Sequence, residues 1–207
     1  MKFEQFKFVF INSDYLKALH AVDSEVLFQE NNNYDLKPHL GILISCNGYH
    51  YVIPLTSAKE KHKKWRDVTP TNYRIYETID IRTAKTDKYD IMVEENDYNK
   101  LRLMGVNAAD YCYYKKRILS VLEIKKMIPV PATQYTLVDL DTPSDDISTE
   151  QRRILMQKEY FFLRKYMEPI LSKAQNTYEK QIASGKVLPF HCNYRKLEII
   201  ADEYQNK

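Results

Sequence analysis

One short segment of the chain brings hydroxyl groups and an amine close together. In Pro54-Leu-Thr-Ser-Ala-Lys, the hydroxyls of Thr56 and Ser57 and the ammonium of Lys59 fall within a single turn of chain. A lysine can offset the charge that builds on a phosphorane, and hydroxyls can orient phosphate oxygens, so this set suits phosphoryl transfer without a metal. The simpler alternative is a capped strand-to-helix turn that carries a solvated lysine.

A β-hairpin is expected to position this segment. Residues 39–45 and 49–55 predict two strands, and Asn47-Gly48 between them is a strong signal for a tight turn, because both residues tolerate a positive φ. Pro54 is expected to end the second strand, since proline cannot donate to a ladder of hydrogen bonds.

Two further side chains precede the first strand of this hairpin, Tyr34 and Lys37. The two strands have similar lengths, so their ends should pair in register. Lys37 is therefore predicted at the same end of the sheet as Thr56. A tyrosine, two lysines and two hydroxyls would then form one cluster.

Other kinds of active site find little support. The sequence has no Walker loop, no GxGxxG motif, no nucleophile-elbow serine and no HExxH motif. The carboxylate pairs at 139–146 share one turn-like segment, whereas a metal site needs ligands that converge from several elements. His50 and His62 flank the basic segment and are open either to acid–base chemistry or to a structural role. No metal and no cofactor are therefore expected.

The distribution of charge is more informative than the net charge of +3. Residues 57–66 hold five cations and one anion, residues 113–126 hold five and one, and residues 151–207 hold eleven and six. Clustered cations with interleaved aromatic rings are what a polyphosphate partner needs. The alternative is that these runs of cations are simply solvated faces.

Length and composition bound the class of protein. A chain of 207 residues that is 44% hydrophobic suggests one domain with a real core. No apolar run approaches the roughly 20 residues that cross a bilayer, and the alternating start of the chain does not resemble a signal peptide, so a cytoplasmic location is expected. Cys46, Cys112 and Cys192 are too scattered for a disulfide framework or a zinc site and are expected to be reduced thiols.

The order of the predicted elements is strands first and helices last, which indicates an α+β fold around a strongly twisted antiparallel sheet. Ser13-Asp14 supplies N-cap chemistry for a short helix. From Met156 to Ile182, apolar residues recur at helical spacing. Pro169 must kink this helix or start a second one, and Gly185 suits a C-cap. Further strands are predicted at 6–10, 73–76, 89–93, 119–124 and 135–140, a helical turn at 99–105 and a last helix at 194–204.

Five blocks of the sequence, in order, resemble the ToxN/AbiQ family, the protein toxins of type III toxin–antitoxin systems and their phage-abortive-infection relatives. The most recognisable block is Tyr-x-x-Pro-Leu-Thr-Ser-x-Lys, which begins at Tyr51. The other blocks are residues 10–16, residues 37–42 with a lysine before x-x-x-Gly, residues 122–129 with Met-Ile-Pro, and residues 157–185 followed by Cys192-Asn193.

The resemblance implies a metal-independent endoribonuclease on a twisted antiparallel sheet with surrounding helices, similar to the Kid/MazF toxins. Such enzymes cut single-stranded RNA by attack of the ribose 2′-hydroxyl and leave a 2′,3′-cyclic phosphate and a 5′-hydroxyl. Lys37, Thr56, Ser57 and Lys59 match the family's pattern and are the expected catalytic residues. Tyr34 is included with them, but it stands one residue nearer to Lys37 than the family's tyrosine does, so its role stays open. Ala58 replaces a proline of the shorter members without touching the chemistry.

The resemblance also implies an RNA partner: an antitoxin of tandem repeats, each folded as a pseudoknot, held with the toxin in a closed ring of three copies of each. Residues 1–207 form one domain in this interpretation. Residues of about 78–115 are an insertion onto which nothing of the family carries over. The alternative function is a non-catalytic RNA-binding module on the same fold. The candidate RNA-binding residues are Lys61, His62, Lys63, Lys64, Arg66, Lys115, Lys116, Arg117, Arg152, Arg153 and Lys186.

Overall fold

The computed structural model describes residues 7–28, 39–46 and 48–205. Within them the chain forms one antiparallel sheet with strand order β4-β6-β3-β2-β1-β8, in which β5 also pairs with β6 and β7 with β3. The strands are β1 (Lys7–Ile11), β2 (His39–Cys46), β3 (Tyr49–Ser57), β4 (Asn72–Asp80), β5 (Asp90–Met92), β6 (Tyr114–Glu123), β7 (Ile128–Pro129) and β8 (Tyr135–Leu137). The helices are α1 (Ser13–Val22), α2 (Glu95–Leu103), α3 (Ile147–Arg164), α4 (Met167–Ser184) and α5 (Tyr194–Gln205).

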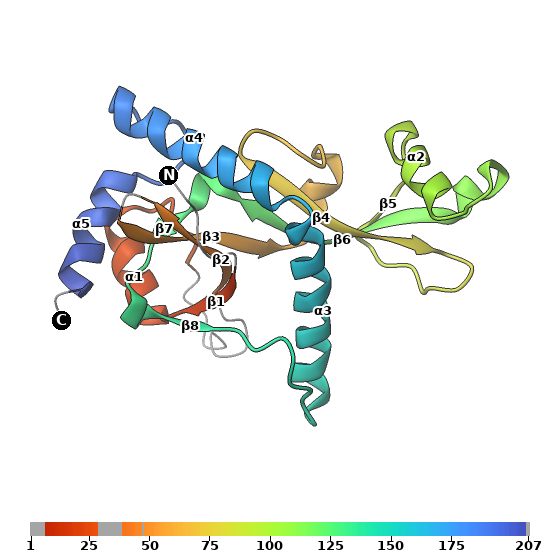
Figure 1. The fold of residues 1–207 in the computed structure, drawn as a ribbon, viewed down its shortest axis with the longest axis horizontal. Coiled ribbons are helices and arrows are strands. Elements are labelled where there is room, and N and C mark those ends of the chain that lie inside the picture. Colours follow the sequence, from red (N-terminus) through yellow and green to blue (C-terminus); the bar gives the residue numbers. More distant parts are fainter. Residues whose placement is uncertain (1–6, 29–38, 47, 206–207) are drawn as a thin grey trace.

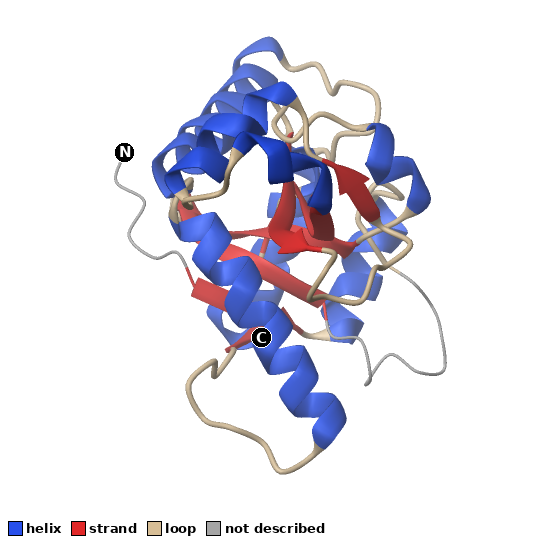
Figure 2. Ribbon diagram, turned by 90° about the vertical axis from the view of Figure 1, so that its right-hand side faces the viewer, coloured by secondary structure: helices blue, strands red, loops and turns tan. Residues whose placement is uncertain are grey.

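The elements divide into a body and a projecting arm (Figure 1). Helices α1 and α5 pack together at one end of the sheet, and α3 packs on β4 and β6 near the middle. Beyond α3, the ribbon of β4 and β6 extends away from the body and carries β5 and α2 at its tip. Figure 2 shows the helices gathered around the strands, which confirms the predicted α+β class. The expected similarity to the Kid/MazF toxins stays a prediction.

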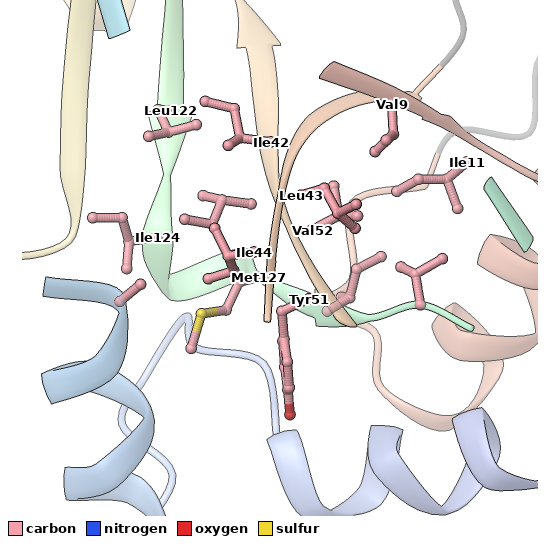
Figure 3. Close-up of a cluster of buried hydrophobic side chains, with 14 of the residues drawn as sticks. Val9, Ile11, Ile42, Leu43, Ile44, Tyr51, Val52, Leu122, Ile124 and Met127 are labelled. Atoms are coloured by element: carbon pink, nitrogen blue, oxygen red, sulfur yellow. The ribbon is translucent and has the colours of Figure 1, made fainter. Parts of the chain in front are cut away.

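The core lies where the central strands meet β1 and the chain that follows β6 (Figure 3). Val9, Ile42, Val52, Leu122 and Ile124 are all fully buried in this cluster. The central strands bury consecutive side chains, such as Ile42, Leu43 and Ile44 of β2. Because successive side chains point to opposite faces, these strands are buried on both faces of the sheet.

The hairpin forms in the predicted register, from Gly41 opposite Pro54 to Cys46 opposite Tyr49. The prediction that Pro54 ends the second strand is wrong. After Pro54, β3 leaves β2 and pairs with β6 through Leu55, Thr56 and Ser57. A proline without an N–H is tolerated at the point where the strand changes its partner. The catalytic candidates Thr56 and Ser57 therefore lie on a strand inside the sheet and not in a turn that follows it.

The N-cap of the first helix differs from the sequence signal, whereas the start of a second helix at Pro169 agrees with it. The N-cap of α1 is Asn12, whose Oδ1 accepts hydrogen bonds from the backbone N–H groups of Asp14 (2.8 Å) and Tyr15 (3.2 Å), so the prediction of a cap at Ser13-Asp14 was wrong by one residue. The long apolar stripe forms two helices, α3 and α4, and Pro169 lies in the first turn of α4 where its missing N–H costs little. Gly185 ends α4 with a φ of 65°, as predicted. In the part of the chain that the structure covers, no helix combines the length and apolar character needed to traverse a membrane.

Candidate active site

The two hydroxyls of the predicted catalytic segment lie at the end of β3 but on opposite faces of the sheet. Thr56 is opposite Val121 of β6 and is half-buried, whereas Ser57 is opposite Ser120 and is exposed. Successive side chains of a strand point to opposite faces. An RNA strand that contacts both hydroxyls must therefore cross the end of β3.

Lys59 is exposed and begins the basic loop, which we define as residues 59–66 and which contains the 3₁₀ helix η2 (Glu60–Lys64). The backbone N–H of Lys59 donates to Nδ1 of His62 at 3.2 Å. The His62 ring is only 1% exposed and packs against Trp65, with 4.6 Å between the ring centroids. Burial, and to a lesser degree the neighbouring cations, lower the pKa of His62 to about 4. His62 is thus a buried, neutral residue that shapes the loop, and its assignment to the RNA-binding surface stays a prediction.

The side chain of Arg74 on β4 anchors the basic loop to the sheet. Its side chain is 3% exposed, and its Nη1 donates to the backbone oxygens of His62 (3.1 Å) and Lys63 (3.2 Å). Its Nε and Nη2 donate to Oδ1 of Asp67 at 2.8 and 2.5 Å. Because the buried guanidinium of Arg74 donates both to the loop backbone and to Asp67, it fixes the path of the loop relative to the sheet.

Lys116 of β6 extends this ion-pair network. Its ammonium lies 2.8 Å from Asp67 and 2.8 Å from Asp97 of α2, and its side chain is 1% exposed. Burial alone would lower the pKa of Lys116, but hydrogen bonds to the two carboxylates outweigh burial and raise it. A buried ammonium with two carboxylate partners is a weaker candidate for a phosphate contact than an exposed one is, and the assignment of Lys116 to RNA binding stays a prediction.

Two arginines of the predicted RNA-binding set are engaged inside the protein. Arg117 pairs with Asp90 at 2.9 Å and also donates to the backbone oxygen of Lys85. Arg153 pairs with Glu150 at 2.6 Å and donates to the backbone oxygen of Leu140 at 2.7 Å. Because these donors already have partners, the two residues are weaker candidates for phosphate contacts than exposed cations are.

The exposed candidates lie mainly on the basic loop. Lys61, Lys64 and Arg66 are exposed there, and the ammonium of Lys61 lies 5.5 Å from the centre of the Trp65 ring. Lys63 is half-buried, with its ammonium 3.1 Å from Glu60 and 3.2 Å from the backbone oxygen of Lys88. Of the remaining candidates, Lys186 is exposed after the end of α4, and Lys115 and Arg152 are half-buried.

Tyr34 and Lys37 lie outside the described residues, so their predicted place in the cluster stays a prediction. The antiparallel pairing puts the start of β2 and the last residues of β3 at the same end of the sheet.

The structure adds one residue that the sequence interpretation missed, Glu123 at the end of β6. Its Oε1 lies 3.1 Å from the hydroxyl of Thr56, and its side chain is 8% exposed. The one signal in the sequence is a glutamate in the otherwise apolar stretch at 121–124. A buried charge in a strand is rare without a specific partner, and such a partner is provided here by Thr56.

The described side chains offer no grouping of three or more His, Cys, Asp or Glu residues that could hold a metal ion. The donor set at the end of β3 consists of hydroxyls and ammonium groups with one carboxylate. Such a set suits an anionic ligand such as a phosphodiester better than a cation.

Comparison with known protein families matches residues 7–202 to the family described as Toxin ToxN, type III toxin-antitoxin system. Endoribonuclease ToxN of Bacillus thuringiensis subsp. kurstaki is 26% identical over 210 residues, which cover 97% of this chain and 85% of that protein. Endoribonuclease AbiQ of Lactococcus lactis subsp. lactis is 23% identical and is covered to 90%, with 97% of this chain aligned. Endoribonuclease ToxN of Pectobacterium atrosepticum is 25% identical, with 93% of this chain and 90% of that protein aligned.

Solved structures of similar proteins share the fold. One, described as AbiQ, a lactococcal anti-phage endoribonuclease belonging to the type-III toxin-antitoxin system, superposes with a TM-score of 0.63 at 22% identity over 99% of this chain and all of that one. A second, from work on selective toxin inhibition by a non-coding RNA pseudoknot, gives the same TM-score of 0.63 and the same identity and coverage. A third, from work on a processed non-coding RNA that regulates a bacterial antiviral system, gives 0.64 at 22% identity over 95% of this chain and 98% of that one.

Proposed function

Because the chain belongs to the ToxN family of type III toxin–antitoxin systems, we propose that this endoribonuclease toxin cuts single-stranded RNA through the ribose 2′-hydroxyl. The products are a 2′,3′-cyclic phosphate and a 5′-hydroxyl, and no metal takes part. The observation that carries the proposal is the Pro-Leu-Thr-Ser-x-Lys segment at the end of β3, with an exposed hydroxyl and an exposed lysine beside a half-buried threonine.

The exposed groups have a direct role in this reaction. Ser57 orients an oxygen of the scissile phosphate, and Lys59 offsets the charge that develops on the phosphorane. Lys37 supplies a second ammonium at the same centre, and Tyr34 completes the cluster. The anchored basic loop supports this role, because catalysis gains most from donors that are already in place before the charge develops.

The inhibitor that fits this protein is a folded RNA. One structural neighbour was described in work on toxin inhibition by a non-coding RNA pseudoknot. The exposed Lys61, Lys64 and Arg66 of the basic loop offer phosphate contacts close to Lys59, and the exposed Lys186 offers another after the end of α4. We propose a repeat-pseudoknot RNA antitoxin, assembled with the toxin as a closed ring of three copies of each.

Alanine substitution tests the catalytic site. Ser57→Ala and Lys59→Ala should each lower the rate of RNA cleavage by about 10²–10³, because each removes one preorganised group from the phosphorane. Ser172→Ala and Lys180→Ala, at exposed positions of α4, are the matched controls and should cleave like the wild type. Cleavage and toxicity at wild-type levels in both site variants would show that the chemistry lies elsewhere.

A chelator experiment separates the mechanism from its alternatives. In excess chelator, the wild-type protein should still cleave RNA and yield cyclic-phosphate ends. Activity that disappears in chelator and returns with Mg²⁺ or Mn²⁺ would contradict the metal-free mechanism. An RNA band that shifts but stays intact under every condition would instead support the non-catalytic RNA-binding module.

A further inference from the structure

We infer that Glu123 is a positioning residue for the cleavage reaction and acts through Thr56 to engage the ribose 2′-hydroxyl. This inference rests on the proposed function and assigns a role that the family motif does not contain. It starts from the hydrogen bond in which the Thr56 hydroxyl donates to Oε1 of Glu123 at 3.1 Å.

A hydroxyl has a single hydrogen to donate, and two acceptors of the protein lie within hydrogen-bond distance of the Thr56 hydroxyl. The two acceptors within reach are the Glu123 carboxylate at 3.1 Å and the backbone oxygen of Val121 at 3.4 Å. The charged and nearer acceptor forms the stronger bond. Both acceptors belong to β6, so in either case the hydrogen points into the sheet.

The direction of this hydrogen limits what Thr56 can do for a bound RNA. A hydroxyl that donates inward can still accept through its lone pairs, but it cannot donate to a phosphate oxygen. Among the groups of an RNA strand at the cleavage point, the 2′-hydroxyl is the one that must give up a hydrogen. Thr56 therefore fits the 2′-hydroxyl, and the phosphate is left to Ser57 and Lys59.

The cleavage step then consists of three proton transfers, one bond formed and one bond broken. As the bond from O2′ to phosphorus forms, the hydrogen of the 2′-hydroxyl passes to Oγ1 of Thr56, and the Thr56 hydrogen passes to Oε1 of Glu123. The bond from phosphorus to O5′ breaks, and the ammonium of Lys59 gives a proton to O5′. Glu123 then loses its proton, and Lys59 regains one, through exchange with water.

The charged and titratable groups near Glu123 come from the neighbouring elements. Asn72 of the adjacent strand β4 is opposite Glu123 in register. Arg74 lies two pairs further along β4, opposite Val121, and is already paired with Asp67. The buried thiol of Cys192 lies near enough for the charge of Glu123 to contribute to its raised pKa, the main cause of which is burial. Lys125 and Lys126 follow in the next turn of chain, and Lys126 pairs with Glu25.

The test is a kinetic comparison of Glu123→Gln with the wild type on a short RNA. An amide keeps the shape of the side chain but cannot take the proton. We expect kcat to fall by about 10²-fold or more with KM unchanged, and the acid limb of the pH–rate profile to disappear. A purely structural residue would not remove that limb. Glu159→Gln, which alters a buried carboxyl on α3, is the matched control and should keep the wild-type profile.

If Glu123→Gln fails to fold, variants of Thr56 test the inference independently. Thr56→Val removes the hydroxyl and should lower kcat like Glu123→Gln, with no further loss when the two are combined, whereas Thr56→Ser should restore activity. A Glu123→Gln enzyme that folds and keeps kcat within twofold of the wild type would overturn the inference. If Ser57→Ala and Lys59→Ala are inactive in the same assay, the proposed function stands and only the role of Glu123 is contradicted. A wild-type protein that does not cleave RNA would mean that the proposed function itself fails.

Discussion

At the scale of single residues, the buried carboxyl of Glu159 makes the stability of the fold depend on pH. It lies on α3 with its side chain 4% exposed, and burial raises its pKa to about 7 from an ordinary value of 4.5. A folded-state pKa above the unfolded value means that the folded protein binds the proton more tightly. The protein therefore loses stability as pH rises from about 4.5 through about 7.

Replacing this carboxyl should remove the loss of stability at high pH. We expect Glu159→Gln to increase the free energy of unfolding by about 2–3 kcal/mol at pH 8 and to change it little at pH 4.5. Thermal unfolding at the two pH values measures the difference, with the exposed Glu203→Gln as control. Equal effects of Glu159→Gln at both pH values would show that Glu159 titrates normally in the folded protein.

At the scale of elements, the conformation of the basic loop depends on the strand beneath it. Arg74 of β4 is the donor that ties the backbone of His62 and Lys63 to the sheet, and Asp67 orients it. The loop begins at Lys59, so its anchoring sets how accurately that lysine meets a phosphate. A misplacement of about 1 Å at a catalytic group can cost 10²-fold in rate.

Arg74→Met should therefore lower the cleavage rate by about 10- to 100-fold and make the lysines of the basic loop accessible to limited trypsin digestion. Removing one partner from a buried ion pair should also destabilise the fold by about 3 kcal/mol, although Lys116 still neutralises Asp67. Arg82→Met, which removes an exposed arginine paired with Asp80, is the control. Unchanged cleavage and unchanged trypsin resistance in Arg74→Met would mean that the loop is held by other contacts.

At the scale of the whole molecule, residues 81–113 form a lobe inserted between β4 and β6, because Asp80 and Tyr114 are partners in register. Within the lobe, β5 pairs with residues 115–117 of β6. The lobe holds five cations and six anions, so it is not a polyanion-binding surface by charge. Its attachment to the body includes the buried contact of Asp97 with Lys116. The prediction of a single domain with an insertion at about 78–115 agrees with this path but stays a prediction.

Replacing residues 81–113 by an Asn-Gly turn, together with Lys116→Met, should give a folded protein that cleaves RNA within a few-fold of the wild-type rate. Lys116→Met is needed because the deletion removes Asp97 and would leave the buried ammonium with one carboxylate. The same deletion with Lys116 retained should unfold at a lower temperature. Circular dichroism and the cleavage assay report the two properties. A folded deletion variant without activity would place part of the active site on the lobe.

Features that depend on neighbouring residues could be predicted from the sequence. The hairpin follows from two strand patterns and a turn signal, the end of α4 follows from Gly185, and the family follows from blocks such as the one at 51–59. These signals work because backbone preferences and turn geometry are set within a few residues of chain.

Which charged and polar groups are available for chemistry depends on packing between distant parts of the chain. In the sequence, Lys116 and His62 look like any other member of a basic run, yet β6 and the basic loop bury them. The continuation of β3 past Pro54 requires a new partner strand, and that strand brings Glu123 to Thr56 from 67 residues away in the chain. Burial and pairing at such separations depend on how strands and helices pack, and local sequence carries no record of that packing.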